Sequence, residues 1–327
     1  MSKQEFSIPS IANRVRTEAD AYLLLEELRW GGKPEACPKC GEVGRCYFLT
    51  PKNGESRTTR TGSVSERRVW KCGGCRKQFS VLTDTIFHGT KIPLRTWLMV
   101  VFEMCSAKNS ISAWEVSRKY DITNESAWHM LHRIREAMKR EPVAGLFTGT
   151  VVADETWIGG NPKNRHRNDP REAPRKPRGG SDKIPVLALV HYETREVRSM
   201  GVIDVNAKSL RKHMAKHLDI PNTHLWTDSA FAYQQMASEF AGHDAVNHSK
   251  GEYKNERGTT TNVAEGYFSQ LKRSLDGTHH HVSLWHLDRY LAQFDWLATN
   301  CRKTDSERMR TLLGNVYGRR LTYNAVA

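Results

Sequence analysis

Residues 150–160 read TVVADETWIGG, a run of strand-forming residues that carries the carboxylate of Asp154 in its middle. β-Branched and aromatic residues favour a strand here, and the glycines at the end favour a turn. A carboxylate within an apolar strand is costly unless it is hydrogen-bonded, paired with a positive charge or bound to a metal. Asp154 is therefore a candidate ligand, although a lone aspartate at such a place is more often a cap or a turn residue.

Outward from this strand, the sequence predicts a mixed α/β domain. After residue 160 the pattern indicates, in chain order, strands at 183–193 and 197–205, a helix at 207–218, a strand at 223–233, a helix at 234–241, a short strand at 244–249 and long helices from about 262 onward. Three strands followed by alternating helices and strands are typical of a sheet flanked by helices.

Asp228 repeats the situation of Asp154 in the strand THLWTDSAFAY, residues 223–233. As with Asp154, a role as a strand-end cap is the simpler interpretation of this residue by itself. Two acids on adjacent strands would, however, converge at one edge of the sheet. Carboxylate oxygens arranged in this way bind divalent cations.

A third acidic position lies in TTTNVAEGYFSQLKRSL, residues 259–275. Asn262 and Glu265 are three residues apart at the start of a predicted helix, and Lys272 returns to nearly the same face as Glu265 two turns later. The pair is also typical of a capping box, in which both side chains only satisfy free helix amides. The sequence is compatible both with a ligand role for these residues and with a capping box.

Two C-x-x-C pairs near the N-terminus predict a structural zinc site, because two such turns supply four thiolates in a tetrahedron. The separation of 31 residues between the pairs exceeds the usual spacing, which implies an inserted loop or hairpin at 51–68. Cys46 fits the spacing less well, and Cys105 and Cys301 are expected to be buried thiols. The predicted ligands are Cys37, Cys40, Cys72 and Cys75.

Residues 112–140 predict two helices joined at 121–124, with Thr123 or Asn124 as the cap of the second. This outline fits a helix-turn-helix, and it also fits an ordinary helical hairpin. In the first interpretation the second helix contacts DNA through Ser126, His129, His132 and Arg133. A basic, proline-rich insert at 161–180 is either a solvated loop or an arm that grips phosphates.

The net charge of +14 and the pI near 9.5 favour a polyanionic partner, and nucleic acid is the first candidate. An anionic membrane surface is the alternative, but no basic amphipathic anchor helix supports it. No apolar run reaches about 18 residues, and the N-terminal segment lacks the apolar core of a secretory signal. We expect a cytoplasmic, nucleoid-associated protein.

Taken together, the motifs resemble the DDE transposases of bacterial insertion sequences, in the group with an N-terminal zinc ribbon. The stretches that carry the resemblance are VVADETWIGG, TDSAFAY, HSKGEY, TTTNVAEGYFSQLKR and HHHVSLWHLDRYLAQFDW. It extends from the cysteines to about residue 303. It implies a ribonuclease-H-like core, a carboxylate cluster that binds two Mg²⁺ ions (or Mn²⁺), and a basic residue after the third acid.

Carried onto this chain, the resemblance implies that Asp154 and Asp228 are the two aspartates and that Lys272 is the basic partner. Glu265 is the expected third ligand, because its distance from Lys272 is the usual one, and Asn262 is the alternative. The histidines at 279–281 are expected to be structural or to contact DNA. The implied domains are a ribbon at 1–92, a helix-turn-helix-like segment at 93–145, a catalytic domain at 146–303 and a tail at 304–327.

The expected function is Mg²⁺-dependent cleavage at the terminal inverted repeats of an insertion sequence and strand transfer to target DNA, by a homodimer or a larger oligomer. Two alternatives from other classes remain. One is a zinc-ribbon DNA-binding regulator with an inactive core, and the other is a structure-specific nuclease that shares the acids but does not join strands.

Overall fold

The computed structural model describes residues 5–50, 57–58, 62, 64–139, 145–159, 183–247, 254–255, 258–280 and 282–325. The chain divides into two compact units. Unit 1 combines residues 1–138 with 303–327, and unit 2 consists of residues 139–302. The basic insert at 161–180, His281 and the whole of HSKGEY (248–253) lie outside the described residues.

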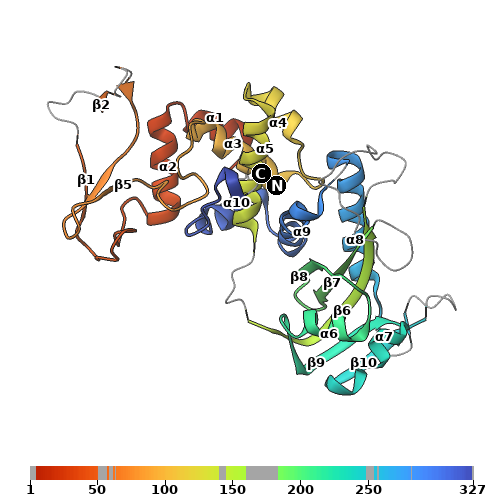
Figure 1. The fold of residues 1–327 in the computed structure, drawn as a ribbon. Helices are drawn as coiled ribbons and strands as arrows, with labels where there is room; N and C mark the ends of the chain where they lie inside the picture. Colours follow the sequence, from red (N-terminus) through yellow and green to blue (C-terminus); the bar gives the residue numbers. More distant parts are fainter. Residues whose placement is uncertain are drawn as a thin grey trace. The chain divides into compact units, whose positions relative to one another are not determined.

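Unit 2 is built on a five-stranded mixed sheet (Figure 1). The order is β10-β9-β6-β7-β8: β6, β7 and β8 form an antiparallel meander, β9 lies parallel to β6, and β10 lies parallel to β9. This is the ribonuclease-H-like arrangement that the resemblance implies, so the predicted fold class is confirmed. The strands are β6 (Phe147–Ile158), β7 (Ile184–His191), β8 (Val197–Gly201), β9 (Leu218–Asp228) and β10 (Gly242–Val246).

The helices of unit 2 cover both faces of the sheet. The predicted helix at 234–241 is wrong in its bounds: a single turn, α7, and a 3-10 turn, η3, stand there instead. The long helices expected after residue 262 are present. The elements are α6 (Ala207–Met214), α7 (Phe231–Gln234), η3 (Ala237–Glu239), α8 (Asn262–Ser274), the π-helical turn η5 (Leu275–His279) and α9 (Leu284–Thr299).

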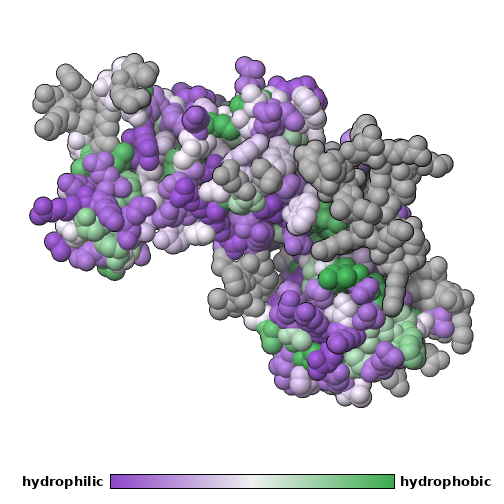
Figure 2. Space-filling view, viewed as in Figure 1, coloured by the Kyte–Doolittle hydropathy of each residue, from purple (hydrophilic) through white to green (hydrophobic). Residues whose placement is uncertain are grey.

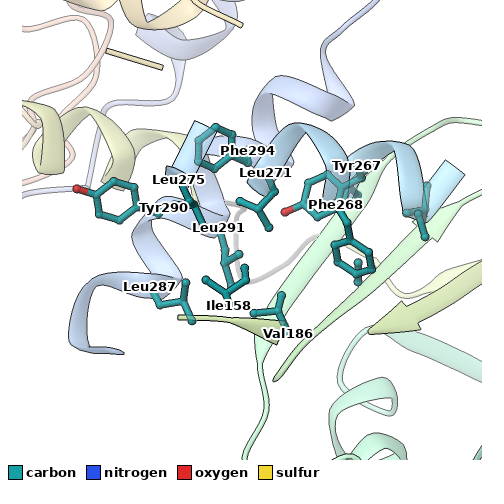
Figure 3. Close-up of a cluster of buried hydrophobic side chains, with 14 of the residues drawn as sticks. Ile158, Val186, Tyr267, Phe268, Leu271, Leu275, Leu287, Tyr290, Leu291 and Phe294 are labelled. Carbon is teal, nitrogen blue, oxygen red and sulfur yellow. The ribbon is translucent and has the colours of Figure 1, made fainter. Parts of the chain in front are cut away.

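Strand alternation sorts the buried side chains of the sheet into two cores. Even-numbered residues of β6, such as Val152, pack with Leu271 of α8 and Phe294 of α9. Odd-numbered residues, such as Val151 and Ala153, lie on the other face of the sheet and pack against α6 and α7. Figure 3 shows the first core, in which the apolar side chains of α8 and α9 lie over strands β6 and β7.

A buried carboxylate ties α8 and α9 to the sheet. Asp295 of α9 accepts hydrogen bonds from the backbone amide of Ser199 (2.8 Å), the Ser199 hydroxyl (2.7 Å) and the Tyr267 hydroxyl (2.6 Å). Burial raises the pKa of Asp295 to about 7, and the hydrogen bonds from Tyr267 and Ser199 oppose that rise. This network holds the helix that carries Glu265 in a single register against β8.

The raised pKa of Asp295 predicts a pH-dependent stability. The folded state keeps a proton between the unfolded pKa near 4 and the folded pKa near 7, so the free energy of unfolding should fall as the pH rises through this window. One such group gives a slope of about −1.4 kcal/mol per pH unit. Urea titrations from pH 4.5 to 7.5 should show this slope reduced in Asp295→Asn; equal slopes in both proteins would contradict it.

Unit 1 joins the N-terminal ribbon, a helical region and the C-terminal segment. The N-terminal helical region is divided into two helices: Thr17 caps the second, and Gly31 ends it in the left-handed conformation (φ 63°). The elements are α1 (Ile8–Arg14), α2 (Glu18–Trp30), β1 (Cys46–Phe48), β2 (Arg57–Thr58), β3 (Val64–Ser65), β4 (Trp70–Cys72), β5 (Gln78–Phe79), α3 (Leu94–Ser106), α4 (Ala113–Tyr120), α5 (Asn124–Met138), α10 (Asp305–Gly314) and η6 (Tyr323–Ala325).

The C-terminal segment packs into the N-terminal helices. α10 lies against α2, α3 and α5, and the Asn315 side chain donates to the carbonyl of Ala137. At the other end of α10, Ser306 exchanges hydrogen bonds with the backbone of Phe6 (2.8 and 3.1 Å). Residues far apart in sequence therefore share one compact unit.

The predicted helix pair of α4 and α5 is present, and Thr123 caps α5 by accepting from the Ser126 amide (3.2 Å). Two of its predicted DNA contacts are wrong. His132 is fully buried and Arg133 is 6% exposed, with the Arg133 guanidinium donating to the carbonyl of His88 (2.7 Å). α5 is buried along most of its length because it is a central helix of unit 1, and Glu125 in its first turn is its one exposed residue.

Candidate catalytic and zinc sites

The two aspartates lie level with each other on neighbouring parallel strands. The β6–β9 ladder pairs Val152 with Trp226. Two residues farther along each strand, this register places Asp154 beside Asp228. Because side chains alternate, both carboxylates belong to the sheet face of Val152 and Trp226, the face that α8 covers. Asp154 and Asp228 therefore lie at matching positions of neighbouring strands and on one face of the sheet, as expected.

Each aspartate is oriented by a local backbone amide. The Glu155 amide donates to Oδ1 of Asp154 (2.8 Å), and the Ala230 amide donates to Oδ1 of Asp228 (3.0 Å). The second contact closes a tight turn directly after β9, so it also fixes the start of the segment that leads into α7.

Glu155 is a third acid at this place that our sequence interpretation did not assign. It alternates to the opposite face of β6, where its carboxylate accepts a hydrogen bond from the buried Tyr233 hydroxyl. Burial raises the pKa of Glu155 to about 7, and the charges of Asp154 and Asp228 raise it further against the lowering effect of Tyr233. The signal was present in the sequence, because Glu155 and Tyr233 both lie in the quoted motifs.

Glu265 stands in the first turn of α8. Its Oε1 accepts from the Thr261 hydroxyl (3.1 Å), and its amide donates to the Thr261 carbonyl (3.1 Å). The cap position is Thr261, and the Asn262 amide donates to the Thr260 hydroxyl (3.2 Å). Since the Glu265 amide is already bonded to Thr261, Asn262 and Glu265 do not form the capping box that was the alternative interpretation.

Helix geometry separates the two candidates for the third ligand. The buried stripe of α8 consists of Ala264, Tyr267, Phe268, Leu271 and Ser274. At about 100° per residue, Glu265 lies about 120° from the centre of this stripe, whereas Asn262 lies nearly 180° away. Both side chains are exposed, as is that of Lys272, which lies two turns after Glu265 on the same side.

The three acids do not form a closed ligand set. Within the described residues, Asp154, Asp228 and Glu265 do not have ligand atoms that all lie within 4.8 Å of one another, whereas the four cysteines do.

The four predicted cysteines converge as a zinc site requires. The Sγ atoms of Cys37 and Cys75 are 3.8 Å apart, as are those of Cys40 and Cys72. Zinc–sulfur bonds of about 2.3 Å in a tetrahedron place the sulfurs about 3.8 Å from each other. The chemistry and spacing of these donors therefore fit a structural zinc ion, as predicted.

The backbone around the cysteines favours thiolates. The Lys39 amide donates to Sγ of Cys37 (3.4 Å), and a hydrogen bond from the backbone of Cys75 lowers the pKa of the Cys72 thiol to about 7. Cys46 pairs with Cys72 between β1 and β4 but is not a member of the four-sulfur group. Burial raises the pKa of Cys46 to about 11, which fits a protonated thiol beside the site.

An aromatic cluster joins the ribbon to α2. Trp70 makes edge contacts with Trp30 and Phe48 at ring distances of 6.2 and 5.7 Å. The buried Glu26 of α2 accepts hydrogen bonds from the Trp70 indole and from Arg68, both at 2.8 Å. The ribbon is therefore attached to α2 through a paired carboxylate as well as through apolar packing.

The other predicted residues fall into two groups. The ring of His279 packs against Tyr290 (4.8 Å) and Phe294 (6.5 Å), which supports a structural role. Cys105 is buried as expected, whereas Cys301 is exposed, so the expectation for Cys301 is wrong.

In the described part of the chain, none of the helices has the length and apolar character needed to cross a bilayer.

Comparisons with known proteins match one family model within each of the two units. Residues 147–299 match the family of ISXO2-like transposase domains, and residues 16–78 match the transposase zinc-ribbon domain. The first span contains Asp154, Asp228, Glu265 and Lys272, and the second contains all four cysteines. An uncharacterized protein in the transposable element ISH50 of Halobacterium salinarum is 26% identical over 303 residues, covering 91% of this chain and 96% of that protein.

Among solved structures, a chain in the cryo-EM structure of a simian T-cell lymphotropic virus intasome with the PP2A regulatory subunit B56 gamma matches at 14% identity. The match covers 57% of this chain and 63% of that chain, with a TM-score of 0.28. A score this low does not establish a common fold.

Proposed function

This chain combines a transposase zinc ribbon with an ISXO2-like transposase domain of the IS1595 group, and on that premise we propose that it cleaves the ends of an insertion sequence and joins them to target DNA. The observation that carries the proposal is the register that places Asp154 beside Asp228, on the sheet face covered by α8.

The donor set fits divalent cations. Asp154 and Asp228 offer carboxylate oxygens on adjacent strands. Burial raises the pKa of the neighbouring Glu155, and the negative charges of both aspartates add to that rise. Oxygen donors of this kind select Mg²⁺ or Mn²⁺ over softer metals. Glu265, steadied by the Thr261 hydroxyl, is the proposed third ligand, and Asn262 is the weaker candidate because its amide is neutral.

Each residue then has a defined task. When bound, two divalent cations supply Lewis acidity for in-line displacement at the scissile phosphate by water or a DNA 3′-hydroxyl. Asp154 and Asp228 hold their carboxylates in one orientation through the amides of Glu155 and Ala230. Lys272, exposed on the Glu265 side of α8, neutralises a phosphate next to the cleaved bond.

The same function assigns the remaining parts. The zinc ribbon, together with α4 and the first turn of α5, binds the terminal inverted repeats, and two copies of the chain bring two ends together. Strand transfer on a duplex that carries the repeat ends, with Mg²⁺, is the direct test. A nuclease would cleave without joining, a DNA-binding regulator would do neither, and either result would overturn the proposal.

Glu265 and Asn262 should separate clearly in this assay. Glu265→Gln is expected to slow strand transfer by about 100-fold or more, since an anionic ligand is replaced by a neutral one, a loss of about 3 kcal/mol of transition-state stabilisation. Asn262→Ala should change the rate by less than about 10-fold. Single-turnover rates at saturating Mg²⁺ measure both. A larger loss in Asn262→Ala than in Glu265→Gln would make Asn262 the third ligand.

A further inference from the structure

The C-terminal segment after α10 lies on the loop that follows the zinc ribbon. Tyr317 forms a β-bridge with Thr85, and the Gly318 amide donates to the Asp84 carbonyl (2.7 Å). The Arg319 guanidinium donates to the carbonyl of Glu136 at the end of α5 (3.0 Å). These contacts fix residues 317–319 between the ribbon loop and α5, so the next residue, Arg320, is held at this place as well.

Basic side chains from four separate segments meet here. Lys39 comes from the first zinc turn, His88 from the ribbon loop, Arg133 from α5 and Arg320 from the C-terminal segment. Lys39 Nζ is 3.7 Å from the Asp84 carboxylate, and His88 Nδ1 is 3.8 Å from it. We call Lys39, His88 and Arg320 the ribbon–tail surface, with Arg133 beneath it.

The electrostatics show that these groups act on one another. Burial lowers the pKa of His88, and the charges of Arg320, Lys39 and Arg133 lower it further, while Asp84 alone raises it. Burial likewise lowers the pKa of Arg133, and Arg320 adds to that effect. Three permanent cations therefore face one carboxylate at this place.

The positive side chains on top are accessible. Arg320 is exposed, and the Lys39 side chain is 33% exposed. Arg133 is buried, with its guanidinium over the Trp97 ring at 5.1 Å, so it adds charge without reaching solvent. Around α10, Figure 2 shows a described surface made mostly of hydrophilic residues.

Other arginines of the same segment are neutralised by acids. Arg310, ten residues before Arg320, forms a two-nitrogen ion pair with Glu5. Arg308 pairs with Asp305 (3.0 Å). A group of positive charges without matching acids destabilises the fold through repulsion. A bound polyanion neutralises these charges, and the counterions that it releases favour binding.

We propose that the ribbon–tail surface binds the phosphate backbone of duplex DNA, so that the C-terminal segment completes the DNA-binding face of the zinc ribbon. The inference rests on the proposed function, because it concerns the binding of the element's own ends. It assigns Lys39 and Arg320 to phosphate contacts, which position the duplex without reading its sequence.

The test compares Arg320→Ala with Arg310→Ala in the full-length, zinc-loaded protein. Binding to a duplex with the repeat ends and to a scrambled duplex is measured by fluorescence anisotropy from 50 to 300 mM salt. Arg320→Ala should weaken binding to both duplexes by roughly 5- to 10-fold at 0.1 M salt and lower the salt slope by about 0.9. Lys39→Ala/Arg320→Ala should lower the slope by about 1.8, Arg320→Lys should retain it, and Arg310→Ala should match wild type.

The outcomes separate the inference from the function it rests on. If wild type binds the repeat duplex but Arg320→Ala and Arg310→Ala share its slope, the ribbon–tail surface does not bind DNA, and the proposed function stands. If wild type neither binds nor joins the repeat duplex, the proposed function fails first. Zinc content and the melting temperature are measured for each variant. If Arg320→Ala has lost zinc, its weakened DNA binding supports the inference only when Arg320→Lys restores DNA binding.

Discussion

Asp154→Asn and Asp228→Asn are each expected to slow strand transfer by about three orders of magnitude or more, while DNA binding stays at the wild-type level. The substitution keeps the size of the side chain and an oxygen for the Glu155 or Ala230 amide. It removes one negative charge from the proposed cation site. A loss of about 4 kcal/mol of transition-state stabilisation corresponds to a rate change of about 10³-fold.

Asp244→Asn is the matched control for these two variants. Asp244 lies on β10 of the same sheet and pairs with His224 (2.9 Å), away from the register that joins Asp154 to Asp228. Its rate should remain within about 2-fold of wild type. Isothermal titration with Mn²⁺ gives a second measurement, in which Asp154→Asn should lose binding. Strand transfer at the wild-type rate by Asp154→Asn would show that the candidate catalytic site is wrong.

Removal of zinc is expected to abolish specific DNA binding and to unfold the ribbon. Structural zinc contributes on the order of 10 kcal/mol to the folding of small zinc domains, and the short strands β1, β4 and β5 have only a small aromatic core to replace it. Cys72→Ala should therefore lose about one equivalent of zinc per chain and bind the repeat duplex at least about 100-fold more weakly. Metal analysis, circular dichroism and anisotropy measure these changes.

Cys46→Ser provides the control within the same ribbon. Cys46 lies beside Cys72 but outside the four-sulfur group, so this variant should keep its zinc and its DNA affinity. If Cys46→Ser released the metal while Cys40→Ser retained it, the ligand assignment would have to change. The chelator-treated protein should still show cooperative unfolding of unit 2, because its two cores contain none of the cysteines of the ribbon.

Glu155 and Tyr233 also explain how the catalytic face is supported from behind. Their hydrogen bond joins β6 to α7, so it fixes the strand that carries Asp154 to the segment that follows Asp228. Burial is the main cause of the raised pKa of Glu155, which is about 7, and the charges of Asp154 and Asp228 add to it. Alternation along the strand places it on the far face, so it is not part of the proposed ligand set.

Local patterns in the sequence were sufficient to predict the cysteine cluster and the elements that carry the candidate acids. The C-x-x-C pairs define the zinc ligands because the spacing alone puts two thiolates on one turn, and the four sulfurs converge as predicted. Period-two alternation located the strands of Asp154 and Asp228, and period 3.6 located the helix of Glu265 and Lys272. The short helix at 231–234 was missed because a single turn has no period to detect.

The tertiary structure decided what depends on distant parts of the chain. The register of β6 with β9 brings Asp154 beside Asp228, and burial of α5 removes His132 and Arg133 from the surface. The packing of residues 303–327 with 1–138 brings Arg320 to the zinc ribbon. Side-chain periodicity is a short-range property of the backbone, whereas register and burial depend on which distant segments close upon each other, and that choice is made by the packing of the whole unit.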